Sequence, residues 1–314
     1  MTAALLAPTP APRTKPITAA PATRELIVLT DDGTRLAVRD YHPANAEVAV
    51  VLTHGWCLSR ESWDRQRRYL IDQWGHRARV IDYDHRGHGR SDAATVATAT
   101  PAQLADDLAT VITALNVTTP LVLAGHSMGA MSVLEFMARD HRPVEPGGLV
   151  LVATAAHHVA EHGLGRMLAT PATGTLHHLV PYLPDHILRR LVGPVCAAVG
   201  RCVHCGGDEQ ATLCTLAASA IARTPLSTAV GFLPGLRSYD AYRALSTITA
   251  HTVVVSGGLD LLTPAVHAHE MVAAIDGAEH IHLPHVGHMV LTEAATAVND
   301  ALGRVLHKCL RSNP

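Results

Sequence analysis

The sequence predicts an α/β protein in which helices cover both faces of a mostly parallel sheet. Short runs rich in Val and Leu recur along the chain, and most are followed by a segment with helical spacing. Strand and helix in regular alternation are typical of a buried parallel sheet. Hydrophobic residues make up 48% of the 314 residues and charged residues only 17%, which is enough apolar material for a large core.

The first segment, residues 1–23, consists mainly of Ala, Thr and Pro, and we expect a flexible tail. Its prolines prevent a continuous helix. A secretory signal would place basic residues before an apolar stretch, whereas Arg13 and Lys15 follow the short apolar pair Leu5 and Leu6. Nothing in this segment therefore predicts export.

A hairpin is expected next. Residues 25–30 alternate in polarity, Asp31-Asp32-Gly33 is a turn signal, and residues 35–41 form the returning strand. Further strand-like runs cover residues 48–53, 79–83, 121–124, 149–153, 252–256 and 280–283. The helix candidates between them include residues 61–74, 103–115 and 128–139.

The long interval between residues 153 and 252 breaks this rhythm. It contains no good strand run, but its leucines recur at mostly helical spacing and are punctuated by prolines. We therefore predict a core formed by residues 24–154 and 245–314, with residues 155–244 inserted as a mainly helical cap.

The sharpest chemical signal is Gly125-His126-Ser127-Met128-Gly129, which lies between a predicted strand and a predicted helix. This is the setting of a nucleophile elbow, in which glycines let the chain turn sharply and lift a serine hydroxyl clear of the sheet. We predict Ser127 as the nucleophile. The alternative is a plain Gly-rich turn.

A serine hydroxyl needs a base, and the base needs a carboxylate that orients it. Asp260 and His288 each follow a late predicted strand, at the edge where open α/β sheets place their sites. We predict that they complete a Ser-His-Asp triad. The rivals for the two roles are the histidines and aspartates nearest in sequence or pattern: His285, His282 and His126 for the base, and Asp276 and Asp84 for the carboxylate. His126 fills the variable position of the elbow, where packing is expected.

An acyl-transfer site also needs donors for the developing oxyanion. We expect one to be the backbone N–H of Met128, directly after the nucleophile. The second should come from the loop His54-Gly55-Trp56-Cys57, and we choose the N–H of Trp56. Its side chain could equally be a core aromatic, which would leave the backbone donor in place.

These motifs together resemble the α/β-hydrolase superfamily over about residues 25–154 and 245–310. The resemblance rests on residues 54–56, 84–91 and 125–129 and on the Asp260 and His288 pair. It implies an eight-stranded, mostly parallel sheet with Ser127 as nucleophile, His288 as base and Asp260 as orienting residue. Residues 84–91 look like the family's structural loop after the fourth strand. Serine at the elbow argues against the epoxide hydrolases and haloalkane dehalogenases of the family, which use aspartate there.

The function expected from this triad is hydrolysis of a carboxylic ester with an apolar acyl group, without cofactor or metal. The same triad leaves open a thioesterase, a lactonase, a carbon–carbon bond hydrolase, a cofactor-free perhydrolase, or a non-catalytic ligand-binding protein. The apolar preference follows, weakly, from the Leu, Val and Pro content of the cap. The sequence predicts neither the substrate nor the oligomeric state.

Charge and cysteine content bound the partners and the compartment. A net charge of −2 gives no general attraction to nucleic acid, and no apolar run is long enough to span a bilayer. The six cysteines are too few for a disulfide scaffold, so we expect reduced thiols and a cytoplasmic protein. Cys196, Cys202, Cys205 and Cys214 could instead form a disulfide or bind a metal.

The sequence contains 22 histidines, and several lie in the predicted cap. Their protonation could make the cap pH-sensitive, although solvated surface histidines explain them as well.

Overall fold

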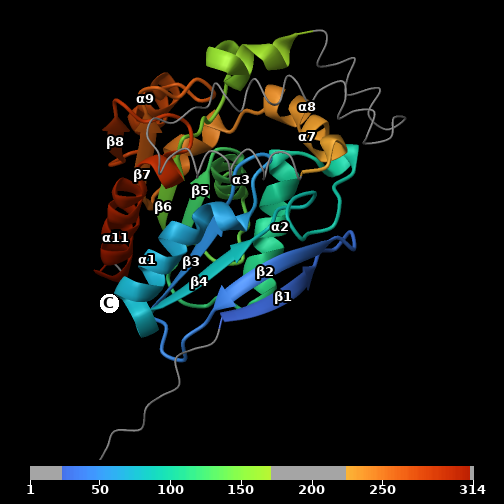
Figure 1. Cartoon of the computed structure of the whole chain (residues 1–314). Coiled ribbons are helices and arrows are strands. Elements are labelled where there is room, and N and C mark those ends of the chain that lie inside the picture. The colour runs from blue at the N-terminus through green and yellow to red at the C-terminus, as the bar shows by residue number, and fades with distance from the viewer. Residues whose placement is uncertain (1–22, 171–223, 312–314) are drawn as a thin grey trace, which may run out of the picture.

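The computed structural model describes residues 23–170 and 224–311, and a single eight-stranded sheet forms the centre of this region (Figure 1). The strand order is β1-β2-β4-β3-β5-β6-β7-β8. The strands are β1 Thr23–Leu29, β2 Arg35–Tyr41, β3 Val48–Thr53, β4 Ala78–Tyr83, β5 Leu121–His126, β6 Pro146–Val152, β7 His251–Gly257 and β8 Glu279–Leu283. The predicted fold class is therefore confirmed.

The sheet is antiparallel at one end and parallel elsewhere. β1 and β2 form the expected hairpin, and β2 also pairs antiparallel with β4. Every later pair is parallel, from β3 with β4 to β7 with β8. The carboxyl ends of six strands therefore lie along one edge of the sheet.

The predicted strands were right in position, with small shifts at their ends. β5 runs two residues further than expected, because Gly125 and His126 continue the parallel ladder beside Leu151 and Val152. β6 ends one residue early, because the backbone of Ala153 turns to a φ of 47° that no strand can hold.

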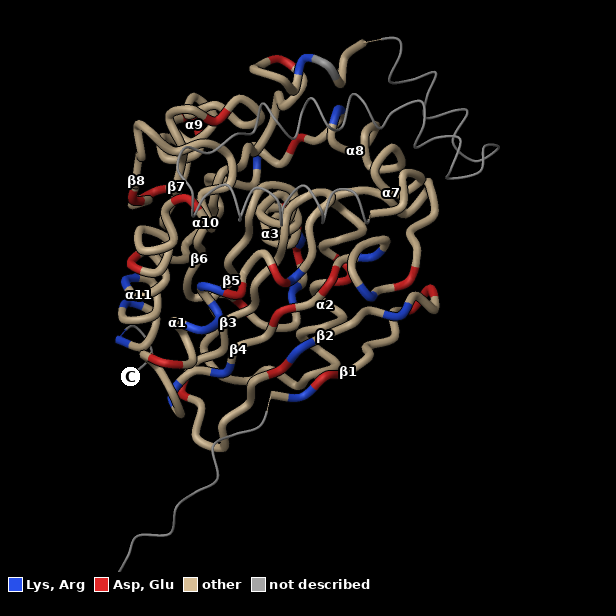
Figure 2. Tube along the Cα trace, viewed as in Figure 1, with Lys and Arg blue, Asp and Glu red and all other residues tan. Residues whose placement is uncertain are grey.

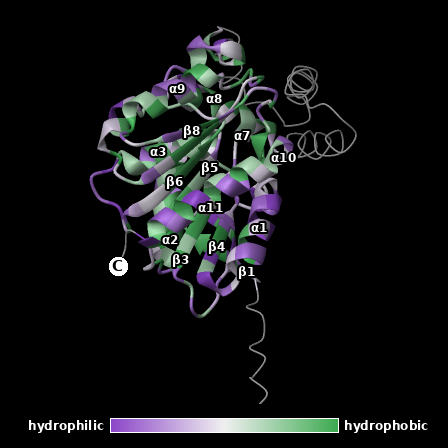
Figure 3. Ribbon diagram, turned by 90° about the vertical axis from the view of Figure 1, so that its left-hand side faces the viewer, coloured by the Kyte–Doolittle hydropathy of each residue, from purple (hydrophilic) through white to green (hydrophobic). Residues whose placement is uncertain are grey.

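Helices cover both faces of the sheet. α1 Asp64–Trp74 and α11 Ala295–Arg311 pack on one face, and α2 Pro101–Ala114, α3 Met128–Met137 and α9 Ala265–Ala274 on the other. Apolar residues of the flanking helices face the strands, as the hydropathy colouring in Figure 3 shows. The residues predicted as one helix from 61 to 74 begin with a 3-10 turn, Arg60–Trp63, which is followed directly by α1.

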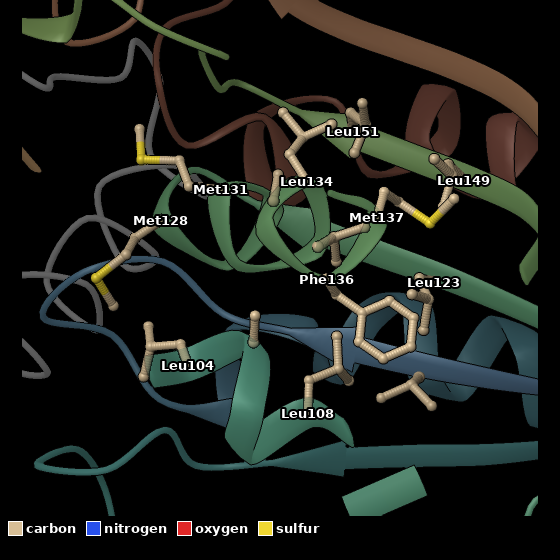
Figure 4. Packing of buried hydrophobic residues seen from close by; sticks show 14 of the residues in the cluster. Leu104, Leu108, Leu123, Met128, Met131, Leu134, Phe136, Met137, Leu149 and Leu151 are labelled. Atoms are coloured by element: carbon tan, nitrogen blue, oxygen red, sulfur yellow. The ribbon is translucent and has the colours of Figure 1, made fainter. Parts of the chain in front are cut away.

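The core on the α2 and α3 face supports the segment that follows β5. α3 is almost entirely buried, and Phe136 and Leu134 are fully covered. Their neighbours come from α2, β5 and β6, as Figure 4 shows for Leu108, Leu123 and Leu149. Because α3 is fixed in this way, so is the residue at its amino end.

Short helices make up the described residues between β6 and β7. They are η4 Val159–Glu161, η5 Gly163–Ala169, α7 Leu226–Gly231, α8 Leu233–Arg237 and η7 Tyr242–Thr247. Residues 171–223 lie outside the described part, so the cap spanning 155–244 stays a prediction. The tail predicted for residues 1–23 also lies outside it, except for Thr23, which begins β1.

Charged side chains form ion pairs across the strands at the antiparallel end of the sheet. Blue and red segments run along β1 and β2 in Figure 2. Arg79 is bidentate to the buried Asp40, and Arg39 to the buried Asp82, at 2.8–3.0 Å.

The remaining short helices are η2 Gly75–Arg77, η3 Val96–Thr98 and α10 Val290–Glu293. Among the residues that the structure describes, no helix is both long enough and apolar enough to cross a bilayer.

Candidate active site

Ser127 lies in a strained turn between β5 and α3. Its φ of 52° and ψ of −121° are unfavourable for a residue with a side chain. A Cβ on Gly125 would fall on the backbone of Ala130, and a Cβ on Gly129 on the carbonyl groups of Thr53 and His54. Glycine is therefore required at both positions, as the sharp turn of an elbow predicts.

The backbone of Ser127 is held on both sides. Its N–H donates to the carbonyl of Val152 at 2.9 Å, and its carbonyl accepts from the hydroxyl of Thr154 at 2.9 Å. The side chain is only half-buried, while its neighbours in β5 and α3 are buried. The turn thus presents one hydroxyl at the carboxyl edge of the sheet.

Asp260 follows β7 at the same edge and is 3% exposed. One carboxylate oxygen, Oδ1, accepts from the amides of Leu262 at 2.8 Å and Thr263 at 2.9 Å. The other, Oδ2, accepts from the hydroxyl of Thr263 at 2.8 Å. A buried carboxylate with this many donors is held in one orientation.

His288 follows β8 and meets Asp260. Its Nδ1 lies 2.8 Å from Asp260 Oδ2, and the imidazole is almost fully buried. Burial raises the pKa of Asp260, but the charge that His288 can carry and the hydrogen bonds from His288 and Thr263 outweigh burial and hold that pKa below its usual value. Asp260 therefore stays ionised and fixes Nδ1 of His288 as the donor, which leaves Nε2 as an acceptor.

The residue before Ser127 contacts the residue predicted as base. His126 Nε2 lies 3.0 Å from the carbonyl oxygen of His288, and the two rings are 5.0 Å apart. The structure thus brings the elbow and the Asp260–His288 pair together. Asp260 and His288 are in direct contact. Ser127 is connected to this pair by the residue before it, because His126 contacts the carbonyl oxygen of His288.

The two predicted oxyanion donors follow β3 and β5, which are neighbours in the sheet. Met128 is the first residue of α3, where helix amides have no partner within the helix. Trp56 lies in the loop after β3, and its indole N–H donates to the carbonyl of Ala229 in α7 at 3.1 Å. The side chain of Trp56 is therefore tied to α7, within the range predicted as the cap, and its backbone remains at the carboxyl end of β3.

Two buried histidines with no role predicted for them hold the loop that contains Trp56. His54 Nε2 accepts from the amide of His85 at 2.9 Å, and His88 Nε2 accepts from the amide of Cys57 at 3.1 Å. Burial lowers the pKa of His54 to about 4 and that of His88 to about 3, so both stay neutral and able to accept. The loops 54–57 and 85–88 are therefore joined through neutral imidazoles.

The rival residues lie elsewhere or have other partners. His282 is exposed and contacts Ser256, and His285 is exposed on the loop before His288. Asp276 is exposed as well. The carboxylate of Asp84 accepts from the amides of Arg60 and Arg90, which matches the loop-structuring role expected for it.

The sequence interpretation missed Thr263 and Glu293. Thr263 stands three residues after Asp260, the spacing at which an aspartate accepts from following amides, and that spacing could have indicated it. Glu293 accepts from the amides of Gly287 and Met289 on both sides of His288, at 2.7 and 3.2 Å. No local pattern marks it.

Four cysteines that could form a disulfide or bind a metal lie outside the described residues: Cys196, Cys202, Cys205 and Cys214. Within the part that is described, no group of three or more His, Cys, Asp or Glu side chains is arranged to hold a metal ion. Of the cap histidines, His157 lies 3.1 Å from Glu270 of α9.

Comparison with known proteins agrees with the fold. The profile of the Alpha/beta hydrolase family matches residues 50–301. That range includes the elbow and the Asp260–His288 pair. The chain therefore belongs to the Alpha/beta hydrolase family, and the resemblance noted from its motifs is confirmed.

Curated relatives carry several activity names. The chain is 38% identical to a non-heme chloroperoxidase of Streptomyces lividans over 38% of its own length and 40% of the relative. It is 36% identical to the bifunctional esterase/perhydrolase DCH of Acinetobacter calcoaceticus over 36% of its length and 38% of that protein. These alignments span about two fifths of each relative. A protein of Variovorax paradoxus named "Putative carbamate hydrolase RutD" is 30% identical over 84% of this chain and 94% of its own length.

Solved structures share the fold over most of the chain. A thermophilic esterase from Thermogutta terrifontis superimposes with a TM-score of 0.74 and 24% identity, covering 91% of this chain and 99% of its own. A bromoperoxidase from Bacillus anthracis gives a TM-score of 0.71 at 19% identity, covering 90% of this chain and 100% of its own. At these identities the likeness concerns the fold alone.

Proposed function

We propose that this protein is a serine hydrolase that cleaves carboxylic esters with an apolar acyl group. Ser127 is the nucleophile, His288 the general base and Asp260 the carboxylate that orients it. The observation that carries the proposal is the 2.8 Å contact between His288 Nδ1 and a fully hydrogen-bonded Asp260, at the strand edge where the strained Ser127 turn lies.

Acylation begins when Ser127 Oγ attacks the ester carbonyl and His288 Nε2 takes its proton. The negative charge that develops on the carbonyl oxygen is stabilised by the amides of Met128 and Trp56. Buried and ionised, Asp260 stabilises the imidazolium that forms. The same proton then passes from His288 to the departing alkoxide, which leaves as the alcohol.

Deacylation repeats these roles with water. His288 accepts a proton from a water molecule as its oxygen attacks the acyl carbon, and the same two amides stabilise the second oxyanion. Collapse of this intermediate releases the carboxylic acid and returns the proton to Ser127. Apart from the attacking water, the chain's own residues supply every group in this cycle.

Two exposed leucines support an apolar acyl group. Leu259 and Leu261 flank Asp260, with 60% and 49% of their surface exposed. The carbonyl of Leu261 accepts from the amide of Leu164, which ties this loop to the segment after β6. The cap proposed for residues 155–244 includes Leu164, so this hydrogen bond joins the proposed cap to the Asp260 loop. The exposed side chains of Leu259 and Leu261 favour substrates that bury an apolar acyl group on binding.

A fluorophosphonate probe and a series of p-nitrophenyl esters of increasing acyl length test the proposal. We expect the probe to label the protein, the Ser127→Ala variant to stay unlabelled, and turnover to fall about 10³- to 10⁶-fold in that variant. Ser246→Ala, at an exposed position, is the matched control and should keep labelling and turnover. Unlabelled wild-type protein that cleaves none of the esters would support a non-catalytic binding protein.

Perhydrolysis is a second candidate, favoured by the Acinetobacter calcoaceticus relative named as an esterase/perhydrolase. In that reaction hydrogen peroxide replaces water, so its oxygen attacks the acyl carbon and a peracid leaves while Ser127 regains its proton. Incubation with acetate and hydrogen peroxide distinguishes the two. Peracid that appears with wild type but not with Ser127→Ala supports perhydrolysis, and ester cleavage without peracid supports the esterase alone.

A further inference from the structure

Two side chains hold one main-chain group in each of the three residues from Gly287 to Met289. The carboxylate of Glu293 accepts from the amides of Gly287 and Met289, at 2.7 and 3.2 Å. Between these amides, the carbonyl of His288 faces Nε2 of His126 at 3.0 Å. The backbone that carries His288 is therefore fixed on both sides.

The protonation of His126 follows from these contacts. A carbonyl oxygen only accepts hydrogen bonds, so Nε2 of His126 carries the proton and donates it. The ring is completely buried, and its other nitrogen, Nδ1, has no hydrogen-bond partner among the residues that the structure describes. Burial, together with the nearby His288, lowers the pKa of His126 to about 3, so the ring is neutral near pH 7. It therefore makes one directed hydrogen bond, to His288.

The same ring also contacts the loop that bears Trp56. A Cβ at Gly55 would lie 2.8 Å from His126 Nδ1 and 3.3 Å from the neighbouring ring carbon. Only a glycine leaves room for the imidazole there. His126 thus lies between the Gly55 loop and the His288 loop, and it directly precedes Ser127.

We propose that His126 and Glu293 are positioning residues which fix His288 relative to Ser127. This inference rests on the proposed function, since it concerns the placement of the proposed base. His126 connects the base to the nucleophile's own turn, and Glu293 stops the loop from rotating about that connection. His126, at the variable position of the elbow, therefore orients the loop of His288 by a hydrogen bond as well as filling space.

The chemistry of histidine explains the choice of residue at position 126. An apolar side chain of similar volume would fill the space but leave the His288 carbonyl buried without a donor. Glutamine carries an amide N–H₂ at about the reach of Nε2 and can donate to the same carbonyl. Replacement by leucine and by glutamine therefore separates packing from hydrogen bonding.

The test compares H126L, H126Q and E293Q with wild type by ester kinetics and proton NMR. We expect kcat to fall about 10- to 100-fold in H126L and E293Q with little change in KM, because a base displaced by about 1 Å transfers protons poorly. H126Q should retain kcat within a few-fold. The far-downfield signal of the His288 Nδ1 proton, identified by its loss in Asp260→Asn, should broaden or shift in H126L and E293Q and persist in H126Q. His285→Leu, on the same loop but exposed, is the matched control.

The outcomes separate failure of this inference from failure of the proposed function. Wild-type kcat and an unchanged NMR signal in H126L and E293Q, with Ser127→Ala inactive, would overturn the positioning role alone. So would a loss in H126Q as large as that in H126L, since it would mean that packing is what matters. If H126L does not fold, E293Q decides, because it keeps the shape of a partly buried side chain and replaces one accepting oxygen with an NH₂ group that only donates. Activity retained in Ser127→Ala would overturn the proposed function itself.

Discussion

The hydroxyl of Thr263 donates to the same oxygen of Asp260 that contacts His288, at 2.8 Å for both partners. Thr263 Oγ1 also lies 3.4 Å from His288 Nδ1. The threonine therefore fixes the direction of the carboxylate lone pairs that orient the proposed base. Since the site is buried, water cannot easily replace this donor.

Replacing Thr263 with valine keeps the shape and removes the hydroxyl. We expect kcat to fall about 10-fold, which corresponds to the roughly 1.4 kcal/mol of a lost hydrogen bond to a charged group. The pKa of Asp260 should rise because one of the interactions that hold it down is gone. Ester kinetics measure the first effect. Thr263→Ser retains the hydroxyl and should stay close to wild type; equal losses in both variants would contradict this role.

Asp260→Asn should be far more damaging. The amide can present its N–H₂ to His288 Nδ1, which favours the tautomer with its proton on Nε2 and removes the acceptor for Ser127. We expect turnover to fall about 10⁴-fold while the fold is retained. Steady-state kinetics measure the loss, and circular dichroism checks the fold. Turnover within 10-fold of wild type would mean that another carboxylate orients the base.

Buried neutral histidines should make the protein less stable in mild acid. Burial lowers the pKa values of His54, His88 and His126 to about 4, 3 and 3, against 6.5 for an ordinary histidine. Below about pH 6.5 the unfolded chain therefore binds more protons than the folded one. The free energy of unfolding should fall as pH drops towards 4, by up to about 1.4 kcal/mol per pH unit for each such histidine.

The variant His88→Gln isolates one of these histidines. Glutamine can still accept from the Cys57 amide but cannot titrate. Urea unfolding between about pH 5 and pH 7 should show a pH slope shallower by up to about 1.4 kcal/mol per unit. His141→Gln changes an exposed histidine and should leave the slope as in wild type. An unchanged slope in His88→Gln would mean that His88 is charged in the folded protein.

The loop that carries His88 depends on a buried ion pair. Arg86 Nε donates to Asp107 at 2.7 Å and Nη1 to Asp32 at 2.7 Å, and both Arg86 and Asp107 are 1% exposed. Arg86→Met leaves the Asp107 carboxylate buried without its partner. We expect the free energy of unfolding to fall by about 3–5 kcal/mol, with recovery when Asp107→Leu is added.

Denaturant unfolding measures this effect, and an exposed ion pair provides the control. Arg304 lies 3.5 Å from Glu279 with 55% of its side chain exposed. Arg304→Met should change the free energy of unfolding by no more than about 1 kcal/mol. Equal effects of the two substitutions would mean that the Arg86 pair gains nothing from burial.

The sheet and the elbow could be predicted from the sequence because their signals are local. Val-rich runs define the strands, and a glycine on each side of Ser127 is required by contacts within a few residues or with the adjacent strand end. Asp260 and His288 could be selected because each directly follows a strand, and parallel strands place their carboxyl ends at one edge. These expectations need only chain order and the alternation of strand and helix.

Glu293 accepts from amides only six and four residues before it, on both sides of His288. The other contacts around the site were decided by tertiary structure. His126 reaches the carbonyl of His288 and His88 the amide of Cys57, and neither pairing leaves a pattern in the sequence. The physical reason is that a buried amide or carbonyl needs a partner, and which side chain supplies it depends on the packing of distant segments. The sequence by itself determined the sheet, the turn at Ser127 and the order of the candidate triad. Packing decided which other side chains hold the loops that carry these residues.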